Sequence, residues 1–200
     1  LVQDLRTPIT GCDLTKAGGL TVTLGTTFTS DAGTQTVVGT ATTALDGSFS
    51  MVAPIGPGFT WHVTGKSLTT SVMAYGTQNT IPAILSEVYL GLRESNNMTM
   101  GDDQHGDVMI RVVRGVAPVT GIAATVTPVL VGSEIHYDSK DSATDWNQVA
   151  TQTLGMVWIP DAQLGAAHIV FGAADGTGTK TPADTTVESQ AIRFITQVLP

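Results

Sequence analysis

The sequence predicts an all-β protein made of two tandem β-sandwich domains of Greek-key type, with one short helix. Threonine accounts for 32 of the 200 residues, and many threonines alternate with Val, Leu or Phe, which suits half-buried strands. The pattern Pro-(Ile/Val)-Thr-Gly-x-x-x-Thr occurs at 8–15 and again at 118–125, an offset of 110 residues. A chain of this length can hold two domains of about 100 residues, each large enough to bury a core.

The first half contains four strand signals separated by turn residues. Leu20, Val22 and Leu24 alternate with threonines, a period of two that predicts a strand. Asp46-Gly47 supplies a turn, because glycine readily adopts a positive φ, and Phe49 and the alternate residues after it would share one face of a strand. The four segments are 18–28, 34–43, 44–54 and 56–65.

One segment of the first half has helical rather than strand spacing. Its apolar residues recur at i, i+3, i+4, i+7 and i+11, namely Ile81, Ile84, Leu85, Val88 and Leu92. A strand here would need both faces to be apolar, so we predict a short helix over 82–93 with Pro82 in its first turn. The polar, glycine-containing stretch that follows predicts a linker at 99–106, between a domain at 1–98 and a domain at 107–200.

The second half mirrors the first. Strands are predicted at 108–115 and after the turn at 117–121, and Gly155 lies 108 residues after Gly47 in a similar turn. The segment 165–173 mirrors 56–65, and 191–200 is predicted as a strand because its residues are β-branched or aromatic. Three matches in the same order predict an ancient tandem duplication.

Composition excludes several classes of function. The net charge is −8, from 9 basic and 17 acidic residues, and a chain without a Lys/Arg cluster repels nucleic acid and anionic lipid. No apolar run approaches 18 residues, so no membrane span is expected. A single cysteine excludes an internal disulfide.

The stretch Ile9-Thr10-Gly11-Cys12 would pass as the acylation site of a bacterial lipoprotein if it followed an apolar signal segment. Asp4 and Arg6 occupy the place of that segment, so a lipid anchor on Cys12 is not expected. Because the chain starts at Leu1 rather than Met, a signal or anchor removed upstream stays compatible with the sequence.

The order of strands and turns resembles the carboxypeptidase regulatory-like modules of the transthyretin-like (prealbumin-like) β-sandwich group, a fold similar to the immunoglobulin sandwich. The recognisable local feature is Thr-x-x-Asp-Gly-x-Phe, here Thr43, Asp46, Gly47 and Phe49. The second copy, 153–157, lacks the Asp and the Phe. The resemblance implies an accessory, adhesive or structural module that is extracellular or in the bacterial cell envelope.

The enzymes of that group have signatures that this chain lacks. Hydroxyisourate hydrolases end in Tyr-Arg-Gly-Ser, whereas this chain ends Gln-Val-Leu-Pro. Intradiol dioxygenases hold iron with two Tyr and two His, the latter as His-x-His, which does not occur here. Nor does the sequence contain the motifs of serine hydrolases, zinc proteases or nucleotide-binding loops. We therefore expect no enzymatic activity and no cofactor.

Two acidic segments are candidate binding sites. Asp102, Asp103 and Asp107 lie within six residues and would help to seat calcium, which takes several oxygens from one flexible loop; a solvated linker explains them equally. For a glycan site, the candidates are Trp146, Asp138, Asp141 and Asp145. An exposed Trp beside carboxylates can stack on a sugar ring, whereas the alternative is an acidic loop whose Trp folds back onto the sandwich. Trp61 and Trp158 are expected in the core.

The leading functional hypothesis is a non-enzymatic, extracellular or cell-envelope structural or assembly subunit that acts through protein partners. Self-association would occur by strand addition, in which the end segments 1–7 and 191–200 lie along open sheet edges of their own chain or a neighbour. The alternatives are a glycan-binding adhesive module with polysaccharide as its partner, and an accessory domain pair of a larger secreted enzyme.

Overall fold

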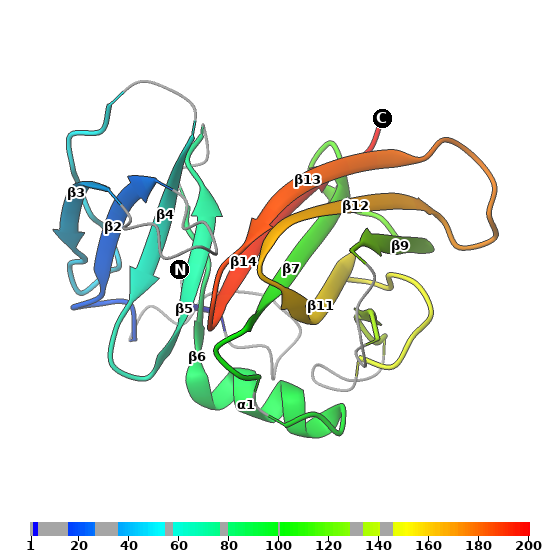
Figure 1. Cartoon of the computed structure of the whole chain (residues 1–200), viewed down its shortest axis with the longest axis horizontal. Helices are drawn as coiled ribbons and strands as arrows, with labels where there is room; N and C mark the ends of the chain where they lie inside the picture. Colours follow the sequence, from blue (N-terminus) through cyan, green and yellow to red (C-terminus); the bar gives the residue numbers. More distant parts are fainter. Residues whose placement is uncertain are drawn as a thin grey trace.

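The computed structural model describes residues 2–3, 16–26, 36–54, 58–76, 80–99, 101–128, 134–140 and 146–200. These residues form an all-β protein with a single short α-helix, and the strands make two sheets in a sandwich-like arrangement (Figure 1). The predicted fold class is confirmed at this level. The helix α1 has ten residues, and the described part of the chain contains no helix with the length and apolar character needed to cross a bilayer.

The larger sheet has eleven strands, and eight of them follow the order β10-β11-β7-β14-β5-β4-β2-β3. Their bounds are β10 His136–Tyr137, β11 Met156–Gln163, β7 His105–Arg114, β14 Ala191–Val198, β5 Leu68–Ala74, β4 Phe59–Thr64, β2 Thr21–Thr26 and β3 Val37–Thr42. Three short strands belong to the same sheet but lie outside this order: β1 Val2–Gln3 pairs with β6 Ala83–Leu85, β6 also pairs with β5, and β8 Ala117–Pro118 pairs with β7. The smaller sheet has the order β13-β12-β9, made of Thr181–Val187, Gly165–Ala173 and Ile122–Thr127.

The last strand, β14, joins the two halves of the chain. It runs parallel to β7 on one side and parallel to β5 on the other, so strands of both halves belong to one continuous sheet (Figure 1). The predicted division into 1–98 and 107–200 did not include the pairing of β14 with β5, because the local sequence pattern of a strand does not identify the strand with which it pairs. The division into two domains stays a prediction.

Most predicted strands are confirmed, but 44–54 is wrong in part. The turn is present, with Gly47 at a φ of 78°. Residues 48–54 then alternate between half-buried and exposed side chains as a strand would, with Phe49 and Met51 packed on the core. They form no ladder with any described strand, so the alternation is present without the hydrogen-bonded partner that defines a strand.

The predicted helix begins later than expected. The helix α1 spans Ser86–Ser95, while Ala83–Leu85 form β6, which pairs with β5 and β1. A strand in this segment requires apolar side chains on both faces, and we expected a helix for that reason. All three residues of β6 are buried, so both faces of this short strand are covered. Glu87 in the first turn and Arg93 in the last turn both complement the helix dipole.

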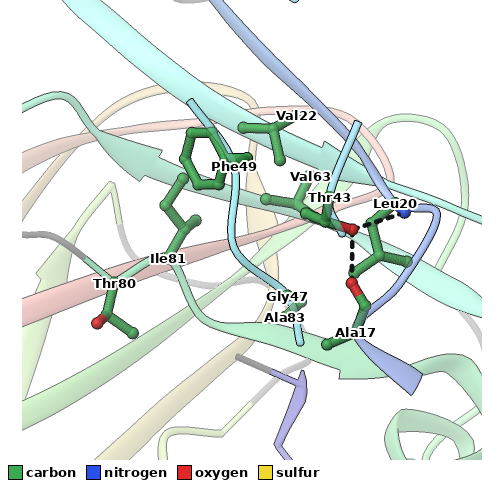
Figure 2. Close-up of a pocket in the computed structure, with 10 residues that line it drawn as sticks. All are labelled: Ala17, Leu20, Val22, Thr43, Gly47, Phe49, Val63, Thr80, Ile81 and Ala83. Atoms are coloured by element: carbon green, nitrogen blue, oxygen red, sulfur yellow. Dashed lines mark hydrogen bonds between the residues drawn. The ribbon is translucent and has the colours of Figure 1, made fainter. Parts of the chain in front are cut away.

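A buried threonine fastens the entry of β2 to the end of β3. The Oγ1 atom of Thr43 accepts the backbone N–H of Leu20 at 2.9 Å and donates to the carbonyl of Ala17 at 2.5 Å (Figure 2). Gly19, at a φ of 76°, lets the chain turn between these two contacts. One hydroxyl therefore satisfies a buried donor and a buried acceptor.

The second half repeats this arrangement. Thr151 accepts the N–H of Ile122 at 3.0 Å and donates to the carbonyl of Val119 at 2.7 Å, and Gly121 has a φ of 75°. The structural counterpart of Gly121 is therefore Gly19, at an offset of 102 residues. The repeated pattern in the sequence paired Gly121 with Gly11, which lies outside the described residues.

The two halves also repeat one feature of topology. In each, an early strand pairs in parallel with a late one: β1 with β6, and β7 with β14. In β7, β11 and β14, successive residues point into two different cores. Val108 and Ile110 face the smaller sheet, while Met109 faces the opposite side. Burial on both faces explains why these strands read as nearly continuous apolar runs.

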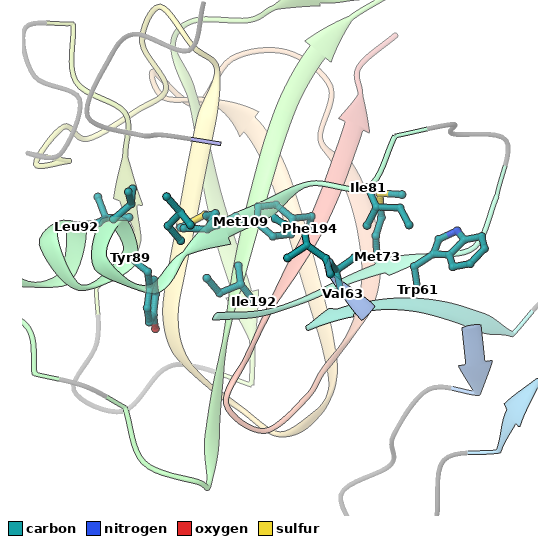
Figure 3. Close-up of a cluster of buried hydrophobic side chains, with 14 of the residues drawn as sticks. Trp61, Val63, Met73, Ile81, Tyr89, Leu92, Met109, Ile192 and Phe194 are labelled. Carbon is teal, nitrogen blue, oxygen red and sulfur yellow. The ribbon is translucent and has the colours of Figure 1, made fainter. Parts of the chain in front are cut away.

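The larger core lies on the side of the eleven-stranded sheet that carries α1. It collects side chains from both halves, including Trp61 and Met73 from the first and Met109 and Phe194 from the second (Figure 3). Trp61 and Trp158 are buried, at 7% and 0% exposure, as predicted. Both halves therefore contribute to this core as well as to the larger sheet.

Candidate assembly surface

Among the described strands, β3 lies at one end of the strand order of the eleven-stranded sheet, and β10 lies at the other. Within that part of the chain β3 pairs only with β2, in antiparallel register. An edge strand presents unpaired N–H and C=O groups to another chain, and proteins usually block such edges with Lys, Pro or other devices. The sequence of β3, VVGTAT, contains no charged residue and no proline.

Exposed apolar side chains occur in β3 and in the chain that follows it. Val37 is 52% exposed in β3, while Leu45 and Val52, in the chain that follows β3, are 90% and 93% exposed. A Cβ added to Gly39 would lie 3.0 Å from Met51 Sδ, so residues 48–54 pack directly against β3. Half of the eight large apolar side chains exposed in the described part lie between 37 and 52. We call Val37, Val38, Leu45 and Val52 the β3 surface.

Both end segments pair within their own chain, one of the two predicted alternatives. Residues 191–198 form β14, which lies between β5 and β7 rather than at an edge. At the other end, Val2–Gln3 lie along β6 of their own chain. The remainder of 1–7 and Cys12 lie outside the described residues.

The structure does not bring the predicted calcium ligands together. Asp102 accepts hydrogen bonds from the backbone of Gln104 and lies 2.6 Å from Nδ1 of His105. Asp107 belongs to β7, and its carboxylate is buried among other donors. Among the described residues, no group of three or more His, Cys, Asp or Glu side chains could hold a metal ion.

Trp146 and Asp138 do not offer the exposed surface expected of a glycan site. Trp146 is fully buried, 6.4 Å from Trp158 between ring centroids in an edge-to-face arrangement, so the expectation of an exposed indole is wrong. The carboxylate of Asp138 accepts the backbone N–H groups of the turn that leads into β11, those of Gln152, Leu154 and Met156. Asp141 and Asp145 lie outside the described residues.

A buried arginine organises a polar network under the larger sheet. Arg93 reaches from α1 to Asp161 with two hydrogen bonds of 2.9 and 2.8 Å to the carboxylate, and its Nε donates to the carbonyl of Thr99 at 2.6 Å. Nη1 donates to Tyr89 Oη at 2.9 Å and lies 3.4 Å from Asp107. Burial lowers the pKa of Arg93, but Asp161, Tyr89 and Asp107 together raise it above its usual value.

Asp107 lies at the centre of this network. Its carboxylate accepts hydrogen bonds from Tyr89 Oη at 2.9 Å, from the indole N–H of Trp158 at 2.7 Å and from the backbone of Asp161 at 3.2 Å. A β-bulge between Ile159 and Ala162 turns Asp161, at a φ of 46°, toward the helix. Burial raises the pKa of Asp107 despite these donors. With its polar groups paired, the network holds α1 on the sheet.

A second buried charge cluster connects the halves on the opposite face. His62 of β4 lies 2.6 Å from Glu188 through Nε2 and Oε2, and Arg193 of β14 lies 3.6 Å from the other carboxylate oxygen. All three side chains are buried. A His–Glu pair resembles the base and orienting acid of hydrolases, but both side chains are buried and a substrate could not reach them. We assign it a structural role.

The cavity in Figure 2 is small and lacks titratable groups. It has a volume of about 90 Å³ and is lined by Val22 and Val63 of the sheet, by Leu20 just before β2, and by the chain around Phe49 and Ile81. Its lining contains no acid, base or cation, so it offers no acid–base chemistry.

Comparisons with known proteins leave the family open. No protein-family model matches the chain, and no curated protein matches its sequence. A solved structure, the minor pilin GBS52 of the Gram-positive pathogen Streptococcus agalactiae, is similar over 92% of this chain and 84% of its own, with 13% sequence identity and a TM-score of 0.32. Similarity at this level assigns neither a family nor a function, and the transthyretin-like resemblance stays a prediction.

Sequence reasoning missed the two buried arginines and the β3 edge. The position of Arg93 carried one usable signal, because it lies four residues after Tyr89 and beside Leu92 on the apolar side of a helix. For Arg193, an arginine within the apolar run AIRFI was the signal. The position of β3 at one end of the sheet follows from the order of the strands, and the local sequence pattern of a strand does not predict that order.

Proposed function

We propose that this chain is a non-enzymatic structural or assembly subunit that associates with protein partners by strand addition at β3. The observation that supports this function is that β3, among the described strands, is paired on one side only, is uncharged and carries the exposed side chains of Val37 and Val38. Backbone hydrogen bonds from the edge give affinity in such pairing, and neighbouring apolar contacts add to it. The extracellular or cell-envelope setting rests on the family resemblance alone.

The β3 surface suits a partner strand that is itself apolar and uncharged. Val37 and Val52 would lose exposed apolar area on pairing, worth roughly 25 cal/mol for each Å² removed from water. No lysine or proline in β3 opposes the approach of another strand. A second copy of this chain carries such an edge, so self-association is the simplest form of the proposal.

Light scattering coupled to size-exclusion chromatography, over a series of concentrations, tests the proposal. The wild-type chain should form dimers or larger assemblies, and the double variant Val37→Lys/Val52→Lys should be monomeric. The matched control is Val116→Lys/Val149→Lys, which places the same charges at residues that are 90% and 84% exposed elsewhere. A monomeric wild type at every concentration, or equal behaviour of the two double variants, would overturn self-association at β3.

A further inference from the structure

A polar cleft lies where α1 ends. Its volume is about 260 Å³, and three segments line it: the end of the helix, residues 134–136 and residues 146–148. The polar side chains at its walls include Ser95, Asn97, Glu134, His136, Asn147 and Gln148. We call this the helix-end cleft; it is separate from the β3 surface.

The walls of the cleft are fixed to one another by hydrogen bonds through Trp146. The backbone N–H of Trp146 donates to Oδ1 of Asn96 at 3.1 Å, and its carbonyl accepts from Nδ1 of His136 at 3.0 Å. The buried indole anchors this residue against Trp158. A site held in this way loses little entropy when a ligand binds.

The chemistry of the walls selects a neutral ligand rich in hydroxyl groups. Among the described residues the lining contains no Lys or Arg, while the carboxylate of Glu134 favours hydrogen-bond donors and repels anions. Asn97, Asn147 and Gln148 carry amides that both donate and accept. Gln148 Nε2 donates to Asn147 Oδ1 at 2.6 Å, so this pair offers a ligand the N–H groups of Asn147 and the carbonyl oxygen of Gln148. Because a carbonyl takes the Nδ1 proton of His136, Nε2 is an acceptor in the neutral ring.

We propose that the helix-end cleft binds a neutral sugar through hydrogen bonds to the hydroxyl groups of one ring. Of the residues first expected to bind glycan, the two that the structure describes serve the cleft neither as a stacking partner nor as a carboxylate: Trp146 contributes its backbone, and the Asp138 carboxylate accepts the N–H groups of the turn before β11. Without an exposed aromatic face, binding depends on the amides and Glu134. The site would allow the subunit to hold a glycan independently of assembly.

Titration with methyl glycosides of glucose, galactose and N-acetylglucosamine, followed by calorimetry and ligand-observed NMR, tests the cleft. We expect saturable binding of at least one probe, weakened about fivefold by Glu134→Gln or Asn147→Ala, the effect of losing about one net hydrogen bond. Glu94→Gln and Gln163→Ala are the controls, because both residues are exposed and outside the cleft. They should leave the dissociation constant unchanged.

Three outcomes would overturn the proposal: no saturable binding of any probe, equal weakening by the cleft and control variants, or binding of calcium chloride instead of sugar that Glu134→Gln removes. Thermal melting of each variant confirms that the fold is kept. The monomeric variant Val37→Lys/Val52→Lys should bind the probe as the wild type does, so this result is separate from the test of assembly.

Discussion

The two buried arginines, Arg93 in α1 and Arg193 in β14, differ in how well their charges are paired. Arg93 has hydrogen bonds to two side chains besides Asp107 and to one backbone carbonyl. Arg193 has one carboxylate 3.6 Å away, and within the described part of the chain Arg193 Nε, Arg193 Nη1 and Glu188 Oε1 have no hydrogen-bond partner. Burial lowers the pKa of Arg193, and the charge of Glu188 offsets this only in part.

This difference indicates that burial of a charge alone does not stabilise a fold. A buried ion pair repays the loss of hydration only with good geometry and additional hydrogen bonds. Arg93 meets that condition and fixes α1 to β7 and β11. Arg193 does not, so the junction between the halves depends on the β5–β14 ladder and the shared apolar core rather than on its charges.

The largest expected effect is at Arg93. Arg93→Met leaves the carboxylates of Asp107 and Asp161 without their cation, and removing one member of a buried pair typically costs about 3–5 kcal/mol. Urea unfolding should show this loss in the free energy of unfolding. A loss below about 1 kcal/mol would mean that the network contributes little and would remove the contrast with Arg193.

A smaller effect is expected at Tyr89. Tyr89→Phe removes one donor to Asp107 and one acceptor for Arg93, which should cost about 1–3 kcal/mol at neutral pH.

The same variant has a signature at alkaline pH. Burial, and secondarily the charge of Asp107, raise the pKa of Tyr89 above its usual value. The folded state therefore favours the neutral phenol. This contribution is complete below the unfolded pKa of about 10 and is lost as the pH rises toward the folded value. Unfolding measured between pH 9 and 11 should show a steeper loss for wild type than for Tyr89→Phe, and equal slopes would contradict the assignment.

The smallest effect is expected where the charges are poorly paired. Glu188→Gln/Arg193→Met removes both charges and leaves an amide near His62. Because replacing a buried ion pair with uncharged side chains is often neutral or stabilising, the free energy of unfolding should stay within about 1 kcal/mol of wild type or rise. A loss comparable to that of Arg93→Met would show that this cluster also holds the halves together.

The strands were predictable because alternation is a local property. The segments around Leu20, Trp61 and Phe171 show their strand character within a few residues. The boundary of α1 was less predictable, because residues 83–85 become a strand only through partners in β1 and β5.

The candidate sites were largely unpredictable for the same reason. Acidic residues close in sequence suggested shared sites, but Asp102 and Asp107 point to different surroundings once β7 forms. Conversely, Arg93 and Asp161 meet across 68 residues. The β3 surface and the helix-end cleft exist only through the order of strands and the packing of separate segments.

The position of β14 also sets an order for synthesis. β5 ends at Ala74 and its partner begins at Ala191, so at translation rates of 5–20 residues per second roughly 6–23 s separate their emergence from the ribosome. Throughout that interval the part of β5 that pairs with β14 has no partner on that side and can pair with other nascent chains. Protection from misassembly on this side of β5 therefore arrives only with β14, and slowing translation between these two strands would lengthen the period of risk.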